Sequence, residues 1–195
     1  MIRGVMRRVS WLAGIVVAMV TCSVVAFPGA KKTTDRNPRA VEQEGFTVVG
    51  IAVRTSNAEQ MTAARPIGTL WERLFKEGVR AAIPNQADGN IVAVYSEYAS
   101  GKDGEYTYLL GARVRKVESA PAGMTVKTVP AGRYAVFTSE RGRVEKVVVE
   151  MWRRVWETPQ NALGGDRTYK ADFEVYDQRA QNPADAVVDL YVAVR

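Results

Sequence analysis

The residues best suited to chemistry lie on alternate positions of strand-like segments. Within Ala171–Tyr176 the acids Asp172 and Glu174 alternate with apolar residues, so both acids share one face of an extended strand. A carboxylate among Tyr and Trp rings suits a cationic, flat or amphiphilic molecule, because the acid supplies opposite charge and the rings supply cation–π contacts and apolar area. Partial burial would also raise the pKa of Glu174 toward values useful for acid or base chemistry.

The direction in which Glu174 points depends on how its strand packs. If Phe173 and Val175 pack against the helices, Glu174 faces the other way. Tyr191, in the last strand-like run, alternates with apolar residues in the same manner. Alternating acids and aromatics are also typical of a water-facing surface of an antiparallel sheet, so a solvated face is the alternative interpretation. Tyr134 and the two tryptophans of the second predicted helix, Trp152 and Trp156, fit a core better than a pocket.

Histidine is absent from the chain, and the one cysteine is Cys22 in the apolar N-terminal segment. This composition excludes Ser-His-Asp and Cys-His catalysis and a zinc site built from the usual nitrogen and sulfur ligands. Catalysis would have to use carboxylates, Tyr, Lys, Arg or Ser, and a metal would have to be a hard cation held by oxygen. The sequence predicts neither a cofactor nor a metal site.

The net charge of the chain is +6, and Arg3, Arg7 and Arg8 supply three of its positive charges. In the remainder, Lys and Arg are interspersed with Asp and Glu. A surface that follows nucleic-acid phosphates needs clustered positive charge. We therefore expect a soluble domain with no nucleic-acid partner.

Residues 1–26 are typical of a signal peptide. Positive residues are followed by an apolar run from Trp11, and Val24–Ala26 supplies the small-residue pattern of a signal-peptidase site. The alternative is an uncleaved membrane anchor over residues 9–27, since about 17–25 apolar residues span a bilayer. Both interpretations export the following domain, for example to the periplasm. Residues 27–44 are polar and lack hydrophobic periodicity, which predicts a flexible linker.

Residues 45–195 contain the same unit of strand, helix, strand and strand twice. Repeats of this kind share the packing of their core more than their amino-acid identities. The first copy is predicted at Phe46–Arg54, Gly68–Lys76, Ile91–Tyr98 and Glu105–Val114. The second is predicted at Gly132–Thr138, Val147–Glu157, Ala171–Tyr176 and Val187–Val194. The pattern predicts an α+β fold of duplicated β-α-β-β units, with an antiparallel sheet, two helices and a central cleft of the kind that often binds ligands.

Several segments resemble the GyrI-like effector-binding domain, in the form found in integron-associated effector-binding proteins and in the ligand domains of AraC-type and multidrug-responsive regulators. They are Pro130–Thr138, the helix with Trp152 and Trp156, Asp172–Tyr176, Val94–Tyr98 and Gly104–Gly111. The resemblance covers about residues 45–195 and implies the duplicated fold with a ligand cleft between its halves.

In that family a Glu of the second half lies at the cleft floor, and the matching position here is Glu174. The resemblance implies aromatic cleft walls at Tyr95, Tyr108, Trp152 and Tyr191. The chain departs from the regulator members because its first 44 residues hold no helix-turn-helix region.

Three functions stay open from the sequence. The first is an exported, stand-alone protein that binds a cationic or amphiphilic small molecule. The second is a hydrolase of small electrophilic toxins, an activity that the resemblance brings into view, with Glu174 as general base. The third is a protein-interaction module. No second acid lies at a demonstrable separation from Glu174, which favours the binder, while oligomeric state and membrane attachment through residues 9–27 are left open.

Overall fold

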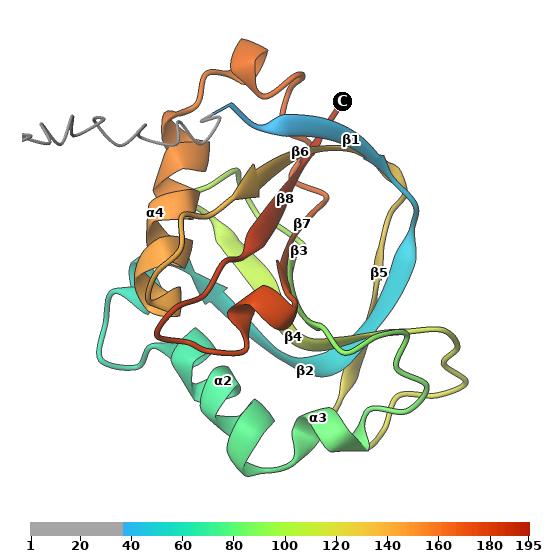
Figure 1. Cartoon of the computed structure of the whole chain (residues 1–195). Coiled ribbons are helices and arrows are strands. Elements are labelled where there is room, and N and C mark those ends of the chain that lie inside the picture. Colours follow the sequence, from blue (N-terminus) through green and yellow to red (C-terminus); the bar gives the residue numbers. More distant parts are fainter. Residues whose placement is uncertain (1–36) are drawn as a thin grey trace, which may run out of the picture. The chain divides into compact units, whose positions relative to one another are not determined.

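The structure is a computed structural model that describes residues 37–195 (Figure 1). These residues form eight strands, four α-helices and two short 3₁₀ turns. In chain order they are β1 (Arg39–Gln43), β2 (Phe46–Ser56), α1 (Asn57–Gln60), α2 (Pro66–Lys76), α3 (Val79–Ala82), β3 (Ile91–Ser96), β4 (Glu105–Val114), β5 (Thr125–Val129), β6 (Gly132–Thr138), α4 (Val144–Glu157), η1 (Gln160–Ala162), β7 (Ala171–Tyr176), η2 (Gln178–Ala180) and β8 (Asp189–Val194).

The predicted duplication is confirmed by the strand order. One antiparallel sheet runs β1-β6-β8-β7-β3-β4-β2-β5. Its six inner strands divide into β6-β8-β7 and β3-β4-β2, so the two β-α-β-β units are related about the central β3–β7 pair. Each unit contributes one long helix, α2 or α4, and Figure 1 shows both helices on the same side of the sheet.

At the two edges of the sheet, β1 pairs with β6 and β5 pairs with β2. Gln43 in β1 pairs with Gly132 in β6, and Phe46 in β2 pairs with Val129 in β5 in the same register. The prediction that residues 27–44 form a linker is therefore wrong for β1, which pairs along its whole length. Hydrophobic periodicity did not reveal β1, because its mainly polar side chains are mostly exposed at the sheet edge.

The sheet has a different apolar core on each face. The helix-facing core contains Leu70 and Leu74 of α2 and Met151 and Val155 of α4, which lie one helical turn apart on each apolar stripe. The opposite face has its own buried cluster, built from strand residues alone. It contains Val48, Val92, Val94, Leu109, Val129, Tyr134, Ala171, Phe173 and Ala193.

Strand β7 does not pack Phe173 against the helices, the arrangement that would have turned Glu174 away from them. Phe173 belongs to the cluster without helices, where its ring lies 5.0 Å from that of Phe46. Glu174 consequently points to the helices. Period-2 alternation separates the two sets of residues correctly, but it does not say which face carries the helices.

The predicted targeting segment, its anchor alternative over residues 9–27 and the first part of the predicted linker lie outside the described residues. Within residues 37–195, no helix has the length and apolar character needed to cross a membrane.

The register of β2 and β4 depends on two glycines that face each other, Gly50 and Gly111. A Cβ on Gly111 would overlap the carbonyl oxygen of Val49, so Gly111→Ala forces the strands apart. We expect this variant to lose at least about 3 kcal/mol of unfolding free energy in urea titrations. Gly68→Ala, in α2, where an added Cβ would meet only the Arg65 Cβ at 4.0 Å, is the control and should gain about 1 kcal/mol. Equal stability of the Gly111→Ala variant and the parent would contradict this register.

Candidate functional site

Glu174 is the centre of the candidate site. Its side chain leaves β7 toward the helices and is 1% exposed. The Tyr95 hydroxyl of β3 donates to Oε1 at 2.8 Å, and the Trp152 indole of α4 donates to the same oxygen at 2.6 Å. The Tyr176 hydroxyl, on the same strand as Glu174, donates to Oε2 at 2.6 Å. Both halves of the duplication therefore supply donors to one carboxyl group.

All three donors to Glu174 are neutral groups. No Lys or Arg among residues 37–195 forms an ion pair with this carboxyl. Burial raises the pKa of Glu174 above its ordinary value of 4.5, and the hydrogen bonds from Tyr176, Trp152 and Tyr95 only partly oppose that rise. The site therefore contains a buried carboxyl group that accepts hydrogen bonds from neutral side chains and is not paired with a positive side chain of residues 37–195.

Aromatic rings enclose the carboxyl on the helix side of the sheet. Tyr95 is the hub, with ring centroids 4.7 Å from Trp152, 5.0 Å from Tyr108 and 5.4 Å from Tyr106. Trp71 of α2 packs edge-on against Tyr176 at 4.8 Å. We call this set the aromatic cage. It consists of Trp71, Tyr95, Tyr106, Tyr108, Trp152 and Tyr176.

The tyrosines of the cage stay protonated under physiological conditions. Burial, followed by the nearby charge of Glu174, raises the pKa of Tyr95, Tyr108 and Tyr176 well above 10.0. The same two causes raise the pKa of Tyr106. At this site Glu174 is thus the group that can change its charge while the tyrosines stay protonated, and burial raises its pKa.

Four of the five predicted site residues come together here: Glu174, Tyr95, Tyr108 and Trp152. Tyr191 does not join them. Its ring stacks on Phe173 at 4.4 Å with planes 9° apart, on the opposite face of the sheet. The separation has a simple cause, because Tyr191 lies on the strand face that alternates with Leu190, and Leu190 belongs to the helix-facing core.

Sequence reasoning missed three members of the cage as site residues, Trp71, Tyr106 and Tyr176, and included Trp152 only through the family resemblance. Tyr176 carried a usable signal, since residues two apart on a strand share a face and Glu174 was already selected. Trp71 carried none, because its place on the apolar stripe of α2 is equally typical of a core residue.

Asp172 is a second buried acid on the same strand, and its surroundings differ. It forms an ion pair with Arg167, accepts from the Tyr98 hydroxyl at 2.8 Å and accepts from the Ala193 backbone N–H at 2.8 Å. The Arg167 guanidinium in turn lies 4.2 Å from the centre of the Tyr169 ring. Asp172 has a cationic partner and fastens β7 to β8, whereas no Lys or Arg of residues 37–195 pairs with Glu174.

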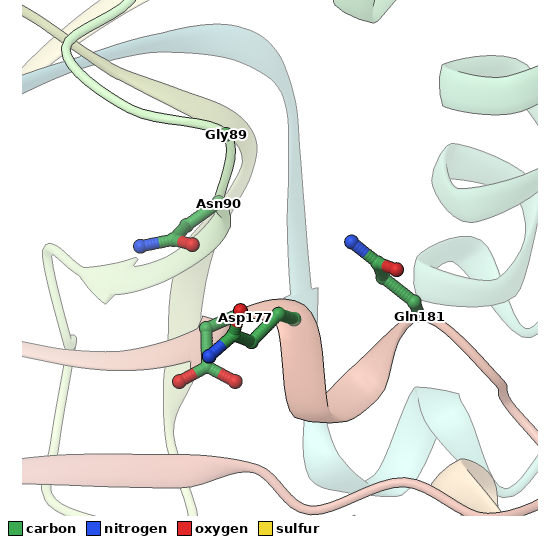
Figure 2. A pocket seen from close by; sticks show the side chains of 5 residues that line it. Gly89, Asn90, Asp177 and Gln181 are labelled. Carbon is green, nitrogen blue, oxygen red and sulfur yellow. The ribbon is translucent and has the colours of Figure 1, made fainter.

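An open depression lies at the ends of β3 and β7, beyond the cage. Asn90, Asp177 and Gln181 face it, as Figure 2 shows, together with Gly89 and Gln178. Its lining is mainly polar, and its volume is about 350 Å³. The space beside Glu174 is instead occupied by the cage rings, so the predicted central cleft is closed at its centre. No group of three or more Cys, Asp or Glu side chains in residues 37–195 is arranged to hold a metal ion.

The two buried acids should respond to neutralisation with opposite signs. Because the folded-state pKa of Glu174 is raised, its contribution to stability is complete below pH 4.5 and falls as the pH rises through the folded pKa. Glu174→Gln removes that fall, so we expect the variant to gain stability relative to the parent as the pH increases toward neutrality. Asp172→Asn breaks a buried ion pair and should cost about 3–5 kcal/mol. Urea unfolding across this pH range measures both, and a parent that becomes more stable than Glu174→Gln at higher pH would contradict the assignment.

A family model described as "Integron-associated effector binding protein" matches residues 39–194. Among curated proteins, YobU of Bacillus subtilis (strain 168), named as a transcriptional regulator, is 38% identical over 147 residues, which cover 75% of this chain and 90% of YobU. The transcriptional regulator BrlR of Pseudomonas aeruginosa is 32% identical over 158 residues, which cover 80% of this chain. The match spans only 54% of BrlR.

Solved structures agree with the fold. The integron cassette protein VCH_CASS2 of Vibrio cholerae superposes with a TM-score of 0.63 at 27% identity, covering 82% of this chain and 96% of that protein. SAV2435, solved bound to tetraphenylphosphonium, superposes with a TM-score of 0.65 at 21% identity, covering 81% and 93% of the two chains. With the duplicated sheet and the family match over residues 39–194, the chain belongs to the integron-associated effector-binding protein family.

Proposed function

We propose that this protein binds a lipophilic cation in the aromatic cage, with Glu174 supplying the opposite charge. The observation that carries the proposal is the burial of Glu174 among neutral donors, with no Lys or Arg in the described part of the chain paired with it. An ionised carboxylate removed from water is costly unless a positive charge compensates it. A cation of the ligand would supply this compensation from outside the chain.

The rings favour a cation that is apolar on its outside. Cation–π contacts with desolvated Trp and Tyr rings are worth about 2 kcal/mol each. Aromatic arms on the ligand would add apolar area against Trp71 and Tyr95. SAV2435 was solved with tetraphenylphosphonium, a cation surrounded by phenyl rings, which supports the same ligand class for this chain.

The contacts of the two buried acids, Glu174 and Asp172, favour ligand binding over catalytic turnover. Glu174 is 1% exposed and accepts three hydrogen bonds from protein side chains, an arrangement that engages both carboxyl oxygens with the protein and not with an attacking group. Asp172, the nearest acid along β7, is committed to Arg167 and Tyr98. A hydrolase would need a second titratable group free to transfer a proton.

Export is a further part of the proposal and rests on the sequence of residues 1–26. A binding protein for lipophilic cations outside the cytoplasm would meet such compounds before they enter the cell. We expect cell fractionation to recover the protein outside the cytoplasm, and mass spectrometry of its N-terminus to begin after Ala26. Recovery in the cytoplasm with the N-terminal arginines intact would contradict export while leaving the binding proposal unchanged.

Calorimetric titration with tetraphenylphosphonium tests the binding proposal. We expect saturable binding that is weakened at least about tenfold by Glu174→Gln, because the buried charge is worth more than about 1.4 kcal/mol to a cation. Asp177→Asn is the matched control: it removes an acid from the open depression and should leave the affinity unchanged. Triphenylphosphine oxide, a neutral molecule with similar rings, should bind weakly to the parent.

Three results of this titration would count against the proposal. Binding that survives Glu174→Gln and is lost in Asp177→Asn would move the site to the depression. Equal affinity for the neutral and cationic compounds would remove the role of charge. Absence of binding to lipophilic cations would reject the ligand class.

A further inference from the structure

The duplication relates the residues around Glu174 in pairs. One and the same sequence spacing separates Trp71 from Trp152, Ala93 from Glu174 and Tyr95 from Tyr176. Ala93 and Glu174 also pair directly across the β3–β7 ladder, so the pseudo-twofold axis of the sheet passes between them. The repeated unit thus brings two equivalent tyrosines and two equivalent tryptophans to a single carboxyl group.

The two tyrosines behave alike at this axis. Tyr95 donates to Oε1 of Glu174 and Tyr176 donates to Oε2. Both hydroxyls come from central strands of the sheet, whose backbones are fixed by neighbours on both sides. A ligand that displaced either tyrosine would have to turn a buried side chain that is packed on the middle of the sheet.

The two tryptophans behave differently. Trp152 donates its indole N–H to Glu174, but Trp71 donates to the Tyr108 hydroxyl at 3.0 Å. Tyr108 pairs with Tyr95 across the β3–β4 ladder. In the second unit, continuing the β7–β8 register beyond Val175 and Asp189 leads to Val188, which is fully buried and has no acceptor in its side chain. The indole of Trp152 therefore has Glu174 as its partner where that of Trp71 has a tyrosine.

We propose that Trp152 is the residue that a bound cation displaces from Glu174, while Tyr108 holds Trp71 in place as a fixed wall of the site. This inference rests on the proposed function. Trp152 is the one donor to Glu174 that comes from a helix and not from the central strands. It uses an oxygen that already accepts from Tyr95, so its departure leaves both carboxyl oxygens with a donor.

The surroundings of Trp152 provide a route for its side chain. Trp156 lies one turn further along α4, with ring centroids 6.2 Å apart, and is 43% exposed. The Trp152 indole thus lies with the buried carboxyl on one side and a partly exposed indole on the other. Rotation of Trp152 toward Trp156 would open the cage from the α4 side and would leave the hydrogen bond between Trp71 and Tyr108 intact.

Nuclear magnetic resonance of the indole N–H groups tests this directly. The purified protein, labelled with ¹⁵N, is titrated with tetraphenylphosphonium, and the signals are assigned from Trp71→Phe and Trp152→Phe. We expect the Trp152 N–H signal to move upfield on binding, because it loses a hydrogen bond to a charged acceptor, and the Trp71 signal to keep its hydrogen-bonded position. A Trp152 signal that stays in place while the cation binds would overturn the inference and leave the proposed function standing. No binding by any variant would reject the proposed function and this inference together.

The affinities of two variants for tetraphenylphosphonium provide a second test, because they are expected to change in opposite directions. Trp152→Phe keeps a ring but removes the competing donor, so tetraphenylphosphonium should bind about three- to tenfold more tightly. Tyr108→Phe releases the Trp71 indole from its acceptor, so the affinity should fall and the Trp71 N–H signal should move. If Trp152→Phe instead weakens binding as much as Trp71→Phe does, Trp152 is a fixed wall and the inference is wrong.

Discussion

The structure depends on one unusual interaction, a carboxyl group buried beneath two helices and held only by neutral donors. Desolvation favours the protonated form of Glu174, and the three hydrogen bonds offset only part of that cost. The cage rings exclude water and make the local medium less polar, which strengthens any charge interaction inside it. Stability and ligand binding are thereby coupled: the feature that costs folding energy at neutral pH is the one that would attract a cation.

The duplicated fold explains how a small chain builds such a site. Two β-α-β-β units meet at the β3–β7 pair, so equivalent residues of each unit converge on one point of the sheet. Ala93 stands where a second glutamate would lie, and the site therefore contains one charge and not two. The neighbouring acid Asp172 is neutralised by Arg167, and its role is to join strands. The same strand thus separates a structural acid from one available to a ligand.

Much of this could be predicted from the sequence, because periodicity and duplication are local signals. The repeated order of elements, the ends of β7 and four members of the site follow from alternation and from the family resemblance. What could not be predicted is the direction in which β7 faces, since alternation is the same for either face. Tyr191 entered the predicted site through the family resemblance, although it lies on the opposite face of the sheet, and Trp71 was left out because its position on the apolar stripe of α2 is equally typical of a core residue. β1 was missed because a polar edge strand resembles a linker.

The ionisation of Glu174, followed with and without a bound cation, tests the coupling most directly. The side-chain ¹³C signal of Glu174 is assigned by comparison with Glu174→Gln and titrated with pH. Uncompensated burial predicts a pKa above 4.5 in the free protein and a lower pKa once tetraphenylphosphonium is bound, because a cation favours the carboxylate. A free-protein pKa at or below 4.5, or one that the bound cation leaves unchanged, would contradict the assignment of Glu174 as the charge that receives the ligand.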